Sequence, residues 1–376
     1  MPALTTTQTA ELAQLSRDIH GDPELAYQER HALAAIADLL ERQGHRVERG
    51  IGGLETAFRT RVGPKDGPAI ALLAEYDALP DVGHGCGHNL IAISNVGAFL
   101  VAAASAARLE VGVELIGTPA EENGGGKIDL LRKGVFDRIL AALSSHPAGQ
   151  GGWAVSGTGL GVVGKRVTFI GVAAHAGSAP EKGRNALNAV VRLFVGIDGW
   201  RQQLDADSRV HGYISDGGKA MNVVPSRAEA IFGLRAKERE TLDGMVERFG
   251  EIAKGAALLT GTKVEIAEYL PYYEPVKANL ALGDVIAAEL ERHGVTPVRG
   301  VLVTASTDLG NVSTKLPTDW VRFPVSEKPV PGHSEQMRDA SISDLAHRNA
   351  MTTAEVLGAA AVRVASDKAL RERIAK

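Results

Sequence analysis

The residues best suited to chemistry gather in one glycine-rich stretch, residues 83–89, with the sequence GHGCGHN. It contains Cys86, the only cysteine of the chain, and two of the eleven histidines. Thiolate and imidazole groups bind divalent metal ions, and the glycines let the backbone turn tightly enough to aim them. A buried thiol beside an exposed histidine would produce the same pattern, so the stretch alone leaves a metal site and a structural role open.

The segments on either side indicate how this stretch is positioned. An apolar run at residues 69–73 precedes it, and a segment rich in alanine, leucine and valine, residues 90–107, follows it. We expect a buried strand and then a helix, which places the stretch in a loop at the end of a strand. Open α/β sheets hold their ligands at this position.

Three more groups of residues that could bind a metal or take part in catalysis lie at comparable positions. Glu121 and Glu122 follow the apolar run 111–117, His146 follows another such run before a proline, and His333 stands beside a Pro-Gly turn. Two adjacent carboxylates can divide the work of a metal ligand and a general base. Each residue alone is more typical of a structural or solvated position, but together they favour a single site.

The order of the predicted elements indicates the fold class. Strand-like runs that end in polar clusters, with helical patterns between them, predict an α/β domain with a mostly parallel central sheet flanked by helices. This pattern covers residues 1–163 and 273–376. Residues 164–272 instead predict an inserted α+β domain, with an antiparallel sheet and two helices. The charged residues 366–376 suggest a solvated tail.

Composition excludes several classes of protein. The chain has 376 residues, of which 44% are hydrophobic and 23% charged, which is typical of a globular protein of two domains. A net charge of -4 gives no basic footprint for nucleic acid, and no run of about 18 apolar residues suggests a membrane span. Without a recognisable signal peptide, and with one cysteine, we expect a cytoplasmic protein.

Several segments together resemble a known family over nearly the whole chain. They are similar to the co-catalytic metallopeptidase and amidohydrolase family of carboxypeptidase G and aminoacylase. The Cys-Gly-His-Asn stretch after EYDALP resembles the amidohydrolase branch, which includes an aminobenzoyl-glutamate hydrolase and an aminoacylase-like dipeptidase. The matching segments are residues 75–89, 117–122, 171–177, 221–225, 306–313 and 331–337.

The resemblance implies a ligand set for divalent metal ions, two per subunit. Thiolate, imidazole and carboxylate groups suit zinc, and manganese, cobalt or nickel are also compatible. The positions that match metal ligands are Cys86, His88, Glu122, His146 and His333.

The resemblance also implies the residues that act on water and on the ligands. Glu121 corresponds to the general base, which activates water and later protonates the leaving amine. Asp77 corresponds to an acid that orients a ligand histidine in members with a His-x-Asp motif. This chain departs there, because Glu75 stands where that histidine would be. Thr307 and Asp308 resemble a segment that lines the site, and we expect them to lie behind the metal ligands.

The inserted domain resembles the family's lid and dimerisation domain, so we expect a homodimer. His175, with no evident partner in its own domain, corresponds to a histidine that stabilises the oxyanion in the partner subunit's site. Asn222 and Arg235 correspond to residues that hold a substrate carboxylate, a task that suits the planar fork of arginine. The structural alternatives are a histidine at a strand end and an arginine in a surface salt bridge.

These assignments predict metal-dependent hydrolysis of an amide C–N bond in a small carboxylate-bearing substrate, such as a dipeptide, N-acyl amino acid or aminoacyl conjugate. Two alternatives stay open. One is a catalytically inactive binding or regulatory relative, against which the presence of Glu121 counts. The other is an amidase in which Cys86 is the nucleophile and His88 or His146 the base.

Overall fold

The computed structural model describes residues 3–376, which form two compact units. The larger unit contains the chain up to Thr158 together with Val276–Val303 and Asp308–Lys376. The smaller unit contains Gly159–Pro275 and Thr304–Thr307. Each has its own sheet and its own buried apolar cluster. The predicted fold class, a mostly parallel sheet with helices plus a separate antiparallel α+β layer, is confirmed.

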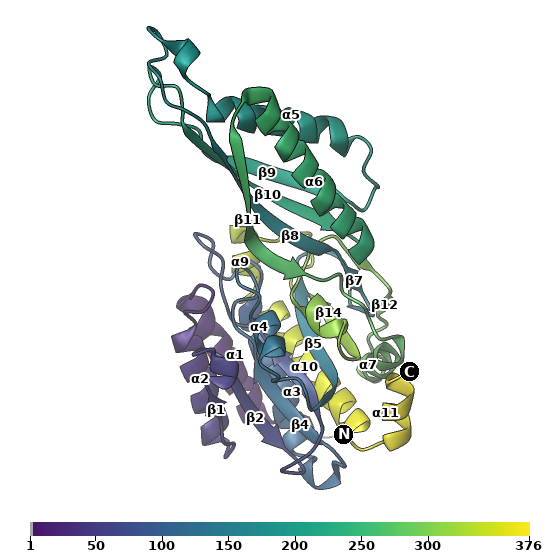
Figure 1. Ribbon diagram of the computed structural model, residues 1–376. Helices are drawn as coiled ribbons and strands as arrows, with labels where there is room; N and C mark the ends of the chain where they lie inside the picture. The colour runs from purple at the N-terminus through teal and green to yellow at the C-terminus, as the bar shows by residue number, and fades with distance from the viewer. Residues whose placement is uncertain (1–2) are drawn as a thin grey trace. The chain divides into compact units, whose positions relative to one another are not determined.

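The larger unit is built on an eight-stranded sheet (Figure 1). Its four central strands, β4, β3, β5 and β14, are parallel, whereas β1, β2 and β6 each have an antiparallel neighbour. In spatial order the strands are β1 (Glu48–Arg49), β2 (Phe58–Val62), β4 (Gly112–Gly117), β3 (Ala69–Ala74), β5 (Ile139–Ala148), β14 (Thr318–Pro324), β6 (Ala154–Val155) and β12 (Val298–Arg299).

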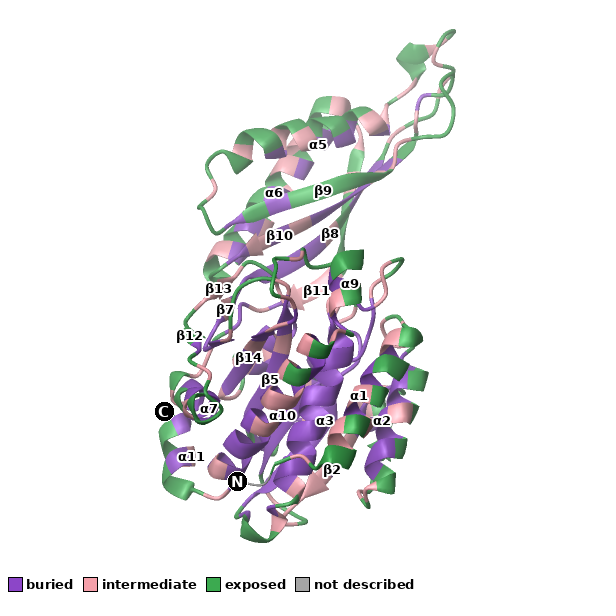
Figure 2. Ribbon diagram, turned by 180° about the vertical axis from the view of Figure 1, so that it is seen from behind, coloured by how far each residue is buried: buried purple, intermediate pink, exposed green. Residues whose placement is uncertain are grey.

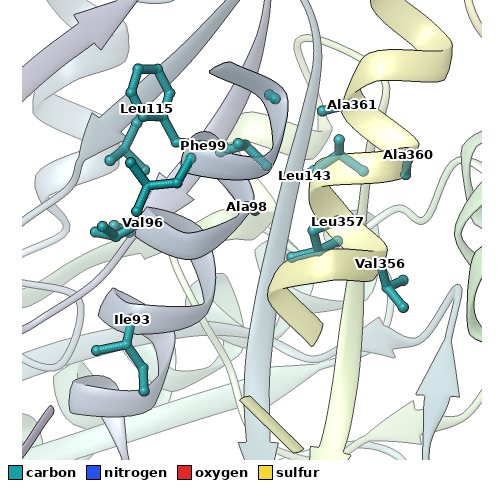
Figure 3. Packing of buried hydrophobic residues seen from close by; sticks show 14 of the residues in the cluster. Ile93, Val96, Ala98, Phe99, Leu115, Leu143, Val356, Leu357, Ala360 and Ala361 are labelled. Atoms are coloured by element: carbon teal, nitrogen blue, oxygen red, sulfur yellow. The ribbon is translucent and has the colours of Figure 1, made fainter. Parts of the chain in front are cut away.

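The central strand β3 is buried on both faces, which explains its continuous apolar sequence. Ile70 and Leu72 join the cluster formed with α3 (His88–Ala103) and α10 (Asp344–Ala365), whose packing Figure 3 shows. The alternate residues of the strand, including Leu73, join a second cluster with α8 (Leu309–Ser313). Helix α3 is buried along almost its whole length (Figure 2), so it is apolar on every side.

The remaining helices of the larger unit are α1 (Thr6–Gly21), α2 (Arg30–Arg42), α4 (Gly126–Arg132), α7 (Leu280–Arg292), α9 (Glu335–Ala340) and α11 (Lys368–Ile374). Helix α11 corrects the expectation of a solvated tail. Leu370 and Ile374, four residues apart, are buried on one face of this helix, and Asp367 caps its first turn. Most of the charges that suggested a tail are exposed, whereas Arg371 pairs with Glu110.

The smaller unit has a four-stranded antiparallel sheet and two helices. Its strands, in spatial order, are β11 (Lys263–Tyr273), β8 (Gly161–Ile170), β10 (Arg227–Ala236) and β9 (Arg209–Asp216). The helices α5 (Ala186–Arg201) and α6 (Arg239–Thr260) pack on this sheet around Phe232 and Phe249. Two further short strands, β7 (Thr158–Gly159) and β13 (Leu302–Val303), form a separate two-stranded sheet, and β13 belongs to the larger unit.

Within residues 3–376, none of the helices combines the length and the apolar character that crossing a membrane requires.

Candidate metal centre

The cysteine-containing stretch lies at the carboxyl end of β3, as expected, but it is not wholly a loop. His88 and Asn89 form the first turn of α3, which begins directly after Gly87. Gly87 has φ +78°, and a Cβ at this position would lie 2.6 Å from Pro147 Cγ. Glycine therefore permits both the left-handed turn and the close approach of the segment that carries His146.

Five predicted ligands form two triads that share one sulfur atom. Cys86, His88 and His146 form the first, and Cys86, Glu122 and His333 form the second. In each triad the potential ligand atoms all lie within 4.8 Å of one another. Cys86 Sγ lies 3.6 Å from His146 Nε2, and Glu122 Oε1 lies 3.7 Å from His333 Nε2. The larger unit thus brings all five together.

Asp77 connects the two triads through separate oxygen atoms. Its Oδ1 accepts a hydrogen bond from His88 Nδ1 at 2.9 Å, and its Oδ2 accepts one from the backbone N–H of Glu122, also at 2.9 Å. The first contact leaves His88 Nε2 as the ring atom that could bind a metal ion. Burial alone would raise the pKa of Asp77, but the charge and hydrogen bond of His88 hold it below its usual value.

Several buried atoms of the cluster have no hydrogen-bond partner among the described residues. They include His88 Nε2, Glu122 Oε1 and Glu75 Oε2. Buried polar atoms in native proteins are normally paired, and each exception calls for an explanation such as an ion. A divalent cation held by the two triads would satisfy the first two, so the donor set fits such a group in both chemistry and arrangement.

The electrostatics of the cluster point the same way. Burial, followed by the charges of Glu75 and Glu122, raises the pKa of Glu121 well above its usual value. Burial also raises the pKa of Glu122, and it raises the pKa of the Cys86 thiol together with the Glu122 charge. Thiolate and carboxylates at this depth need nearby positive charge, which bound cations would supply.

A buried lysine, missed by the sequence analysis, supplies one fixed cation. Lys127 Nζ lies 2.7 Å from Glu75 Oε1 and 2.6 Å from Asp308 Oδ1, and its side chain has no exposed surface. Burial alone would lower the pKa of Lys127, but these carboxylates raise it. The signal in the sequence that could have pointed to Lys127 is its position directly after three glycines. Glu75 therefore forms an ion pair with Lys127. Asp308, which is expected to line the site, is the second ion-pair partner of Lys127.

The backbone is strained next to two of the functional side chains. Ala120, directly before Glu121, has φ +60°, and His333 has φ +56°. Residues other than glycine adopt this region rarely, and they do so mainly where surrounding contacts enforce it, often at functional sites. The N–H of His333 donates to Gly85 O at 2.9 Å, which ties its segment to the cysteine-containing stretch.

His175 and Asn222 lie next to each other in the smaller unit, both exposed. His175 pairs as an isolated bridge with Val223, and Ala176 donates to the carbonyl of Asn222. The expectation that His175 lacks a local partner is wrong, because its Nδ1 accepts the N–H groups of Gly177 and Ser178 at 3.2 and 3.1 Å. A neutral ring so held carries its proton on Nε2, where it can be donated.

Arg235 lies at the opposite end of the same sheet. It donates to Ser306 Oγ at 2.8 Å and to His211 Nε2 at 3.3 Å. Along β10, Arg227 marks the end nearest Asn222, and Arg235 lies about 26 Å further on at the usual rise per residue. Within one chain, therefore, the structure does not bring Arg235 together with His175 and Asn222.

Comparison with known proteins shows what the chain is similar to. Residues 160–259 match the family model described as a peptidase dimerisation domain. The chain is 34% identical to the Xaa-Arg dipeptidase of Mus musculus, over 97% of this chain and 88% of the relative. It is 30% identical to a p-aminobenzoyl-glutamate hydrolase polypeptide of Escherichia coli (strain K12), over 95% and 89%.

Solved structures share the fold at lower identity. A dinuclear metal-binding peptidase of the M20 family from Bacillus subtilis has a TM-score of 0.69 at 21% identity, covering 96% of this chain and 99% of that one. An aminobenzoyl-glutamate utilization protein from Klebsiella pneumoniae has a TM-score of 0.73 at 22% identity, covering 94% and 96%. The family resemblance and the enzyme class predicted from sequence are thus confirmed, and the chain belongs to the M20 family of peptidases and amidohydrolases.

Proposed function

We propose that this enzyme hydrolyses an amide C–N bond in a small substrate that carries a carboxylate, such as a dipeptide, an N-acyl amino acid or an aminoacyl conjugate. The observation that carries the proposal is the pair of triads that share Cys86 Sγ, with the buried acid Glu121 directly before a ligand of the second triad. Dipeptidases and amidohydrolases among the relatives support the substrate class.

Cys86, His88 and His146 would hold one divalent ion, and Cys86, Glu122 and His333 would hold a second. Zinc and manganese are the first candidates, and cobalt and nickel suit the same ligands. A bound divalent cation acts as a Lewis acid toward the substrate carbonyl and lowers the pKa of water towards about 7. A free cysteine is typical of a reducing compartment, which agrees with a cytoplasmic location.

Glu121 is proposed to move the proton. Its pKa is raised by burial and by neighbouring acids, and bound cations would lower it towards the range in which a carboxylate can accept a proton and return it. The proton would go from water to Glu121 and then to the nitrogen of the leaving amine. Asp77 would orient His88 throughout, and Glu122 would serve as ligand rather than base.

The smaller unit is proposed to supply substrate contacts from two subunits. Arg235 would pair with the substrate carboxylate in its own subunit. His175 and Asn222, at the other end of the sheet, would serve the partner's site, where the Nε2 proton of His175 would stabilise the oxyanion. A two-fold homodimer built through residues 164–272 would place both sets in each site, with residues 1–163 and 273–376 as the catalytic domain.

One experiment separates this proposal from its rivals. Purified enzyme is stripped of metal, reconstituted with zinc or manganese, and given an Xaa-Arg dipeptide, p-aminobenzoyl-glutamate and N-acetyl amino acids. The proposal expects turnover that a chelator abolishes and metal restores. Turnover that survives chelation but is lost on thiol alkylation would favour Cys86 as nucleophile. Metal binding without turnover of any substrate would favour an inactive relative.

A further inference from the structure

Glu121 stands between two backbone N–H groups, each of which is held by a different buried carboxylate. The N–H of Glu122 donates to Asp77 Oδ2 at 2.9 Å, and the N–H of Ala120 donates to Glu29 Oε1 at 2.9 Å. Asp77 already belongs to the metal centre through His88. Glu29 lies 91 residues before Ala120, and its hydrogen bonds within residues 3–376 go to none of the proposed ligands.

Glu29 is itself fixed by further contacts. It precedes α2, is fully buried, and also accepts the backbone N–H of Tyr27 at 2.9 Å on the same Oε1. Its Oε2 accepts the hydroxyl of Thr56 at 2.8 Å, and the carbonyl of Thr56 accepts the buried hydroxyl of Tyr76 at 2.6 Å. Glu29 thereby joins three chain segments that are distant in sequence.

Glu29 holds Ala120, whose backbone is strained. Ala120 has φ +60°, and its carbonyl accepts the N–H of Gly125 at 2.7 Å, so its two peptide groups are each fixed by one hydrogen bond. A left-handed alanine persists only where its surroundings over-determine it. Without Glu29, the N–H of Ala120 would be buried without its partner, and the turn could relax to a more favourable φ.

We propose that Glu29 is a positioning residue, which holds the Ala120 turn so that Glu121 and Glu122 present their carboxylates to the metal centre. The role in turnover rests on the function proposed above, whereas the role in placing Glu122 does not. Glu29 acts only through the backbone of Ala120. A displacement of the order of 1 Å in a catalytic group can lower a rate about 100-fold, so the clamp should be visible in kcat.

Four variants test this role, with Glu24→Ala as the matched control. Glu24 also accepts two backbone N–H groups at the start of α2, from His31 and Ala32, both at 2.9 Å, but it does not touch Ala120. Glu29→Ala removes the clamp, and Glu29→Asp shortens it while keeping the charge. Glu29→Gln can still accept both N–H groups with its amide oxygen and donate to Thr56 from its amide nitrogen.

The readouts are kcat, KM and the visible absorption spectrum of the cobalt-loaded protein, which reports ligand geometry without turnover. We expect Glu29→Ala and Glu29→Asp to lower kcat about 10- to 100-fold, to change KM little, and to alter the cobalt spectrum. Glu29→Gln should show the wild-type kcat and cobalt spectrum. Glu24→Ala should show them too, even if this variant is less stable. If Glu29→Ala cannot be purified, Glu29→Asp carries the test.

A wild-type cobalt spectrum and kcat in Glu29→Asp would overturn the proposal, as would equal losses in Glu24→Ala. If the wild-type enzyme turns over none of the substrates, the proposed function fails, but the cobalt spectra still decide the role of Glu29.

Discussion

His88 donates its Nδ1 hydrogen to Asp77 Oδ1 at 2.9 Å, while the other oxygen of Asp77 accepts the N–H of Glu122 at 2.9 Å. One buried carboxylate thereby orients the side chain of a proposed ligand in the first triad and the backbone of a proposed ligand in the second. This relationship links the carboxyl end of β3 to the turn after β4, two neighbouring strand ends that contribute residues to the proposed centre.

Asp77→Asn should therefore weaken metal binding. Asparagine has one acceptor oxygen, so it can satisfy either His88 or the N–H of Glu122 but not both. Loss of such an orienting partner typically lowers metal affinity about 10- to 100-fold. Titration with a competing chelator measures the change, and Glu289→Gln, at a buried acid bound to Arg292 and Arg363, is the control. Equal affinity in both variants would contradict the role of Asp77.

The stability of the protein should depend on pH through Glu29. Burial and the charge of Asp77 raise the pKa of Glu29 to about 7, above the usual value near 4.3. The folded state then binds more protons than the unfolded state between these values, so this group lowers stability as pH rises from about 4.5 to 7. Glu29→Gln keeps the hydrogen bonds but cannot ionise.

Relative to wild type, Glu29→Gln should gain about 1–3 kcal/mol of unfolding free energy between pH 5 and pH 8. Urea denaturation at both pH values, with chelator present so that metal binding does not contribute, measures the gain. A difference that stays constant with pH would show that Glu29 has the same pKa in the folded and unfolded states.

Arg235→Ala should impair substrates with a free carboxylate far more than their amidated counterparts. A charge-assisted arginine–carboxylate contact contributes about 1.5–3 kcal/mol, or roughly ten- to hundredfold in kcat/KM. Lysine should rescue only in part, because it lacks the planar fork. The control is Arg209→Ala, at the residue paired with Arg235 on β9. Equal losses on both substrates would assign Arg235 a structural role instead.

Two inactive variants should restore activity when they form a dimer, because each active site is proposed to contain residues from both subunits. In a heterodimer of His175→Ala with Glu121→Gln, one site has an intact Glu121 and receives an intact His175 from the partner. After unfolding and co-refolding equal amounts of the two inactive variants, about a quarter of the wild-type activity should return. If the mixture stays as inactive as its components, His175 acts in its own subunit or not at all.

Much of the fold and of the site followed from local sequence signals. Apolar runs that end in polar clusters predict β3, β4 and β5, and the structure brings the predicted ligands near the carboxyl ends of these strands together, with His146 inside β5 rather than in a loop after it. The structure differs from these local signals at two further places. The glycine-rich stretch predicts a loop at His88, which instead begins α3, and the charges of residues 366–376 predict a solvated tail, although Leu370 and Ile374 are buried.

Glu29 and Lys127 could not be predicted in the same way. Each acts through partners far away in sequence: Glu29 through Ala120, and Lys127 through Asp308, 181 residues on. A single glutamate before a helix normally predicts a solvated side chain. A lysine after glycines normally predicts a loop residue. Only the fold shows that both are buried, Glu29 against the Ala120 turn and Lys127 between Glu75 and Asp308.

The central claim is that Glu121 moves the proton while the two triads hold the metal, and Glu121→Gln separates these roles. Metal content and kcat/KM are to be measured on wild type and on this variant after identical reconstitution with zinc or manganese. The account predicts the same number of bound ions per protomer and a fall in kcat/KM of at least about 100-fold. Near-wild-type turnover in a fully loaded Glu121→Gln enzyme would contradict it.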